Sequence, residues 1–93
     1  MREVLPVAAQ WVREGRAFAV ATVAGIRGSA PRELGASMLV AADGAVFGNV
    51  SGGCVEGAVV EACLDALADD MASVHTYGIS DDAVLGFGLT CGG

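Results

Sequence analysis

The chain has 93 residues, of which 54% are apolar, and a formal net charge of −6 with no lysine. This length makes one domain, and the negative charge argues against nucleic acid or an acidic membrane surface as partners. The absence of lysine excludes a P-loop and a Schiff-base lysine, and no apolar run reaches the roughly 18 residues of a membrane span.

The first third of the chain predicts a helix, a buried strand and a long loop. Residues 2–14 carry apolar side chains at helical spacing, with Trp11 on the apolar stripe, and Gly15 is a typical helix end. Residues 17–24 are apolar, rich in valine and bounded by glycines, which favours a buried strand. The eleven residues 25–35 are predicted to form a loop that holds two of the five arginines.

The middle of the chain predicts a β-hairpin followed by a helix. Two apolar runs, residues 37–42 and 45–50, flank Asp43-Gly44, and an Asp-Gly pair favours a hairpin turn with positive φ. A short loop over Ser51–Gly53 leads into a helical pattern from about Cys54 to Asp70.

The last quarter of the chain is less regular. Residues 73–77 are predicted to form a strand, whereas residues 78–93 are glycine-rich without a clear period. Ser80-Asp81-Asp82 could cap a short turn of helix there. We therefore expect one α+β domain over residues 1–93, interrupted at its C-terminal end and without a Rossmann domain. Its mixed sheet should contain the Asp-Gly hairpin, with two main helices packed on it.

The three cysteines favour free thiols. Their number is odd, the chain is not dense in cysteine, and no secretory apolar segment precedes them, so we expect a cytoplasmic location. With no Cys-x-x-Cys pair and His75 as the one histidine, a closed zinc site is not expected. A mean hydropathy of +0.58 is high for a small domain, so some apolar surface should pack on a second copy or a neighbouring domain.

The hairpin should bring two loops to one edge of the sheet. Because its strands are antiparallel, the loop that enters the first strand and the loop that leaves the second meet at the same edge. Arg27 and Arg32 from the first loop should therefore lie near the glycine-cysteine turn at residues 51–54. A guanidinium group there can hold a phosphate or carboxylate with two parallel hydrogen bonds.

The start of the second predicted helix adds an anion site and a reactive thiol. Helix N-termini present unpaired N–H groups, and glycines let an anion approach the backbone closely. The same field favours the thiolate of Cys54, and the carboxylate of Glu56 suits the helix dipole. Cys63 falls on the opposite, apolar side of the helix, so we expect it in the core.

Several linked motifs, in order over nearly the whole chain, resemble the XdhC/CoxI family. They are Arg27-Gly28-Ser29-Ala30-Pro31-Arg32, Asp43-Gly44, the segment Gly48 to Glu56 (GNVSGGCVE), Tyr77 to Asp81 (YGISD) and Gly88 to Gly93 (GLTCGG). The resemblance implies a maturation factor, not a metabolic enzyme, for molybdenum hydroxylases such as xanthine dehydrogenase and carbon monoxide dehydrogenase. Such factors bind molybdenum cofactor, support its sulfuration with a cysteine desulfurase and help insert it into the apoenzyme, and many are homodimers.

The resemblance also implies which residues bind the cofactor, an anionic pterin phosphate with a dithiolene that is held transiently. The expected set is Arg27, Ser29, Arg32, Ser51, Gly52, Gly53, Cys54, Glu56 and Cys91, with no catalytic or metal-ligating residue. Typical members of the family continue into further strands and a Rossmann-type domain, and we expect neither within these 93 residues.

Two other functions stay open on the residues alone. Cys54 could be the nucleophile of a thiol-dependent enzyme, with His75 as its base. Alternatively, the apolar surplus could make the chain a dimerising module without a ligand. The candidate residues also have plain structural interpretations, in which Cys54 and Cys91 close turns and the arginines are solvated.

Overall fold

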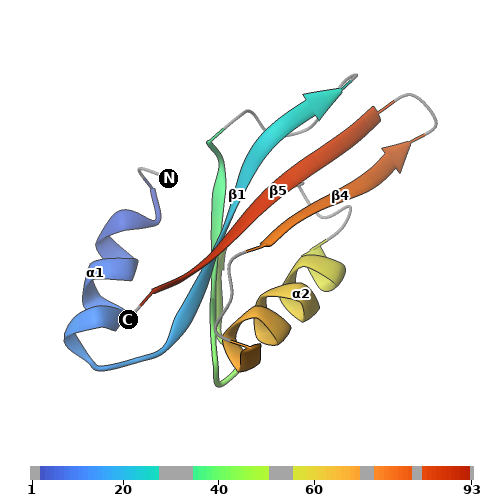
Figure 1. Cartoon of the computed structure of the whole chain (residues 1–93). Coiled ribbons are helices and arrows are strands. Elements are labelled where there is room, and N and C mark those ends of the chain that lie inside the picture. Colours follow the sequence, from blue (N-terminus) through green and yellow to red (C-terminus); the bar gives the residue numbers. More distant parts are fainter. Residues whose placement is uncertain (1–2, 28–34, 51–55, 70–72, 81–82, 93) are drawn as a thin grey trace.

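The computed structural model describes residues 3–27, 35–50, 56–69, 73–80 and 83–92; for Ile26, Arg27 and most of residues 73–92 it describes the backbone alone. These residues form α1 (Leu5–Arg13), β1 (Phe18–Arg27), β2 (Ser37–Ala41), β3 (Val46–Gly48), α2 (Glu56–Asp69), β4 (Ser73–Ser80) and β5 (Ala83–Gly92), shown in Figure 1. The strands make one sheet in the order β3-β2-β1-β5-β4. The predicted α+β class, the hairpin and the two helices are confirmed.

The sheet is antiparallel at each of its four described strand pairs, whereas a mixed sheet was expected. The reason is the path of the chain through α2. Strands joined through a helix usually pair in parallel, and β3 and β4 do run in the same direction. However, they lie at opposite edges of the sheet, with β2, β1 and β5 between them, so they never pair.

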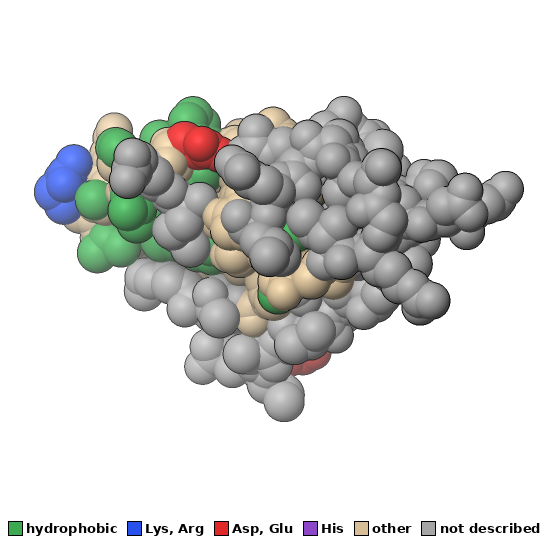
Figure 2. All heavy atoms as spheres, turned by 90° about the horizontal axis from the view of Figure 1, so that it is seen from above, with side chains coloured by type: hydrophobic (Ala, Val, Ile, Leu, Met, Phe, Trp, Pro, Cys, Tyr) green, Lys and Arg blue, Asp and Glu red, His purple; other side chains and the backbone are tan. Residues whose placement is uncertain are grey.

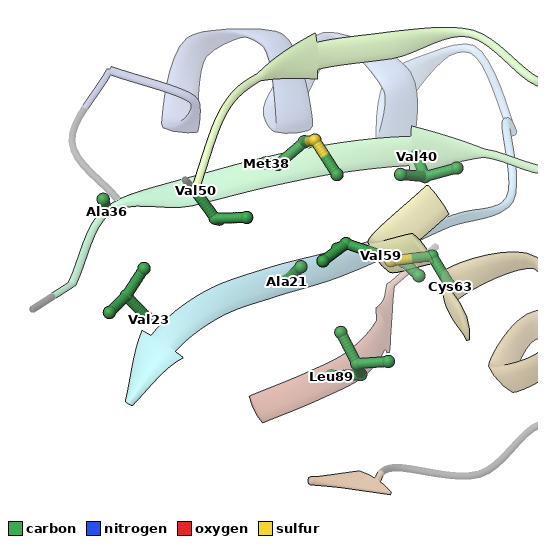
Figure 3. Close-up of a cluster of buried hydrophobic side chains, with 10 residues drawn as sticks. Ala21, Val23, Ala36, Met38, Val40, Val50, Val59, Cys63 and Leu89 are labelled. Carbon is green, nitrogen blue, oxygen red and sulfur yellow. The ribbon is translucent and has the colours of Figure 1, made fainter. Parts of the chain in front are cut away.

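β1 is buried on both faces because its side chains alternate between two cores. Ala19, Ala21 and Val23 belong to the core under α2, which also contains Val59 and Cys63 (Figure 3). Phe18, just before Ala19, and the intervening Val20 pack on the other face with Trp11 of α1. Cover on both faces explains the uninterrupted apolar run of the sequence and confirms the buried strand. Cys63 is fully buried in the core, as predicted.

α1 is held on the sheet by an aromatic pair and one arginine. Trp11 is buried and meets the Phe18 ring edge-on, with 5.7 Å between the ring centroids. The Arg16 guanidinium lies 4.7 Å from the centre of the Trp11 ring and donates a hydrogen bond of 2.9 Å to Asp43 Oδ2. The end of α1 is thereby tied to the turn of the β2–β3 hairpin, and Trp11 packs beneath the first helix as the sequence indicates.

The hairpin turn places the Asp-Gly pair one position later than a two-residue turn would. The Gly44 N–H donates to the Ala41 carbonyl (2.9 Å), and the Ala41 N–H donates to the Ala45 carbonyl (2.8 Å). The central residues are therefore Ala42 and Asp43, and Gly44 follows with φ +94°. This is a three-residue loop with a glycine bulge, in which Asp43 Oδ1 accepts the Ala45 N–H at 3.0 Å.

Two segments predicted as irregular belong to strands. β1 continues through a bulge at residues 23–25 as far as Arg27, and residues 83–92 form β5, which pairs with β1 along most of its length. The helical turn suggested at Ser80-Asp81-Asp82 was wrong, because Ser80 ends β4 and Ala83 begins β5. Gly25 opposes Gly86 where the register shifts after Val23, and a glycine within a strand often marks such a bulge.

Part of the apolar surplus lies on the surface. The large exposed apolar side chains are Leu5 and Val12 of α1 and Val46 and Phe47 of β3. Figure 2 views the molecule from the top of Figure 1, and its green apolar side chains lie on the side where Figure 1 draws α1. Among the helices that the structure describes, neither is long and apolar enough to cross a membrane.

Candidate functional site

The candidate site lies where β2 begins, β3 ends and α2 starts. Met38 near the start of β2 pairs with Gly48 at the end of β3. Two residues later the Val50 side chain is fully buried in the core under α2. The Val50 N–H donates to Oε1 of Glu56, the first residue of α2, at 3.3 Å. The two ends of segment 51–55 are therefore joined by a hydrogen bond.

Gly48 gives this end of the hairpin a conformation that other residues rarely adopt. Its φ is +87°, and a Cβ atom added there would lie 2.6 Å from the Ser37 carbonyl oxygen and 3.0 Å from Val4 Cγ1. Ser37 is itself buried, donates to the Gly35 carbonyl at 3.1 Å and lies 3.2 Å from the Thr22 hydroxyl. The chain thus turns toward the candidate site through a position that only glycine fits.

Asn49 is a site residue that the sequence analysis did not single out. Its Oδ1 atom is buried and has no hydrogen-bond partner within the described part of the chain. Buried polar atoms are nearly always paired, so an acceptor without a donor beside segment 51–55 is notable. An amide directly before a glycine-rich turn, in Gly48-Asn49-Val50-Ser51, was the available clue.

Arg27 lies at the same end of the sheet but farther out. It is the last residue of β1, opposite Val84, whereas β1 pairs with β2 only as far as Thr22 and Ser37. Five further residues of strand at roughly 3.3 Å each put the Arg27 backbone about 16 Å beyond Thr22. The β1 arrowhead in Figure 1 marks this end of the sheet.

The structure does not bring Cys91 to the Arg27 end of the sheet. Cys91 lies on β5 opposite Ala19, eight residues back along β1 from Arg27, or about 26 Å of strand. The other predicted site residues, Ser29, Arg32, Ser51, Gly52, Gly53 and Cys54, fall outside the described residues. Their convergence on an anion therefore stays a prediction.

The pKa of the Asp43 carboxyl is shifted, but Asp43 lies away from this site. The Ala45 N–H and then the Arg16 guanidinium, both hydrogen-bonded to Asp43, lower the pKa of that carboxyl below 3.8. Asp43 occupies the hairpin turn, at the opposite end of β2 and β3 from Gly48. Within the described ranges, no group of three His, Cys, Asp or Glu side chains could hold a metal ion.

Comparison with known proteins identifies relatives for almost the whole chain. It is 36% identical over 92 residues to the molybdenum cofactor insertion chaperone PaoD of Escherichia coli, covering 99% of this chain and 29% of PaoD. It is 39% identical over 77 residues to a Bacillus subtilis protein named as a probable subunit of xanthine dehydrogenase, covering 80% of this chain and 23% of that protein. The chain thus spans less than a third of these relatives.

A solved structure shares the fold. The crystal structure of a xanthine dehydrogenase from Bacillus halodurans superposes with a TM-score of 0.79 and 20% identity, over 92% of this chain and 29% of that one. The sequence model of the XdhC and CoxI family matches residues 11–78, which include the hairpin and all of α2. The chain belongs to the XdhC and CoxI family.

Proposed function

We propose that this chain is part of an accessory protein that binds molybdenum cofactor and assists its insertion into a molybdenum hydroxylase. The observation that carries the proposal is the similarity to an insertion chaperone over 99% of the chain. It is supported by membership of the XdhC and CoxI family and by the relative named as a probable subunit of xanthine dehydrogenase.

The described residues at the candidate site suit such a cargo in one specific respect. A pterin carries N–H groups, and Asn49 Oδ1 is a buried acceptor that lacks a donor in the described chain. In the proposal, Asn49 accepts from the pterin, and the backbone N–H groups of residues 51–54 and the two arginines hold the phosphate. Cys54 faces the sulfur and metal end of the cargo, Ser29 and Ser51 supply further donors, and Cys91 is a second thiol.

The proposal extends to partners. Handover requires an apoenzyme of the molybdenum hydroxylase class, and sulfuration of the cargo requires a sulfur donor, for which we propose a cysteine desulfurase. The exposed side chains Leu5, Val12, Val46 and Phe47 favour a homodimer. We propose a cytoplasmic location for it.

Direct binding tests the proposal. The protein is incubated with molybdenum cofactor and separated by gel filtration, and the bound pterin is oxidised and measured by fluorescence. We expect stoichiometric retention by the parent and at least tenfold weaker retention by Cys54→Ala, Arg32→Ala and Asn49→Leu. Arg13→Ala, which changes an exposed residue at the end of α1, is the matched control and should bind as the parent does.

Two results would contradict the proposal. Equal retention by all of these variants would mean that the cargo does not use this end of the sheet. A covalent adduct on Cys54 with repeated substrate turnover would favour the thiol-dependent enzyme instead.

A further inference from the structure

We propose that Glu56 is a positioning residue, whose carboxylate holds the two ends of segment 51–55 together and does not bind the cargo itself. The inference rests on the proposed function for its consequence, the placement of Cys54 for the cargo. The hydrogen bond that carries it belongs to the chain without any ligand.

Val50 is fixed from two directions. Its side chain is fully buried in the same core as Val59 and Cys63 of α2, and its N–H donates to Glu56 Oε1 at 3.3 Å. The apolar contacts hold the side chain against the helix, and the carboxylate fixes the direction of the backbone. The end of the hairpin is thereby aligned with the start of α2.

The bond closes a short ring of chain. Donor and acceptor are six positions apart, and the residues between them are the glycine-rich segment with Cys54. Gly52 and Gly53 have no side chain and restrict the backbone little. Joining the flanks removes many of the paths that such a segment could take between them. The placement of the thiol therefore depends on a residue two positions after it.

The charge of Glu56 also argues for positioning over direct binding. An ionised carboxylate repels the phosphate of an anionic cargo, so a direct contact between the two is unfavourable. Toward Val50 the same charge strengthens the hydrogen bond, because a carboxylate is a better acceptor than a neutral amide. At the first residue of α2 it also interacts favourably with the helix dipole.

The first test uses the protein without cargo. Amide hydrogen exchange at Val50 and the alkylation rate of Cys54 are measured for the parent, Glu56→Ala, Glu56→Gln and the control Glu61→Gln, an exposed carboxylate on the same helix. We expect exchange at Val50 to rise about tenfold or more in Glu56→Ala and the alkylation rate of Cys54 to change with it. Glu56→Gln keeps an acceptor oxygen and should restore most of the protection, and Glu61→Gln should match the parent.

The second test adds molybdenum cofactor. Glu56→Gln should retain it almost as the parent does, and Glu56→Ala should retain it less. Unchanged exchange at Val50 in Glu56→Ala would overturn the inference, whether or not the cofactor binds. Loss of binding in Glu56→Gln with Val50 still protected would overturn it too, because Glu56 would then be a ligand. If the parent also fails to bind, the proposed function fails, but changed exchange and alkylation would still support the positioning role.

Discussion

Replacing Gly48 with alanine separates two costs that the structure assigns to this position. The φ of +87° strains any residue with a Cβ atom, at about 1–2 kcal/mol. The new Cβ would also lie 2.6 Å from the Ser37 carbonyl oxygen, a backbone atom that can yield only if β2 shifts. Overpacking of this kind adds about 1–3 kcal/mol. The expected destabilisation is therefore about 2–5 kcal/mol, against a total stability of about 5–15 kcal/mol for a typical domain.

Two other glycines serve as controls for this substitution in urea unfolding, which gives the free energy by linear extrapolation. Gly44 has φ +94° but open space around a Cβ, so Gly44→Ala should show the strain alone, about 1–2 kcal/mol. Gly57 lies in α2 with open space and no positive φ, so Gly57→Ala should stabilise by up to about 1 kcal/mol. If Gly48→Ala costs no more than Gly44→Ala, the contact with Ser37 is not a real constraint.

Three further outcomes follow from the described side chains. Arg16→Ala removes both the contact with Trp11 and the ion pair with Asp43, and should lower the free energy of urea unfolding by about 1–2 kcal/mol. The difference from the parent should be smaller at high salt, because salt screens the ion pair. The control Arg13→Ala should cost under about 0.5 kcal/mol. The folded-state pKa of Asp43 is lowered, so its stabilising contribution is complete above the ordinary value of 3.8 and is lost as the pH falls below it. Asp43→Asn should accordingly be less stable than the parent at neutral pH, and the difference should shrink in acid unfolding measurements. Cys63 is fully buried, so mass spectrometry should find it unalkylated in the native protein and modified once urea unfolds the chain; prompt native labelling would contradict its place in the core.

Local patterns predicted much of the fold correctly. The helical spacing around Trp11 and Cys63, the apolar run over residues 17–24 and the Asp-Gly pair each depend on neighbours within a few positions. Their elements are α1, α2, β1 and the β2–β3 hairpin. In each case the residue pattern and the tertiary environment agree, so the sequence was sufficient.

The missed elements depend on distant partners. β5 contains Gly86 and Gly88, which have low strand propensity, and it is stabilised by pairing with β1, whose paired residues lie 57 to 74 positions earlier. The same pairing carries β1 past Gly25, where a glycine after an apolar run suggested a loop. Asn49 was missed for a related reason, because burial of its Oδ1 atom follows from tertiary packing and not from its own residue type.

The path of the chain limits how far the Arg32 backbone can lie from the start of β2. The Val23 N–H donates to the Ala36 carbonyl and the Gly35 N–H donates to the Val23 carbonyl, both at 2.9 Å, so the chain returns to β1 at Val23 before entering β2. Arg32 is three residues before Gly35, and three residues reach at most about 11 Å. Arg27 instead sits on β1 about 13 Å beyond Val23. The Arg32 backbone therefore lies within about 11 Å of Gly35 whatever path the chain takes, whereas contact with Arg27 requires a cargo that extends along the projecting part of β1.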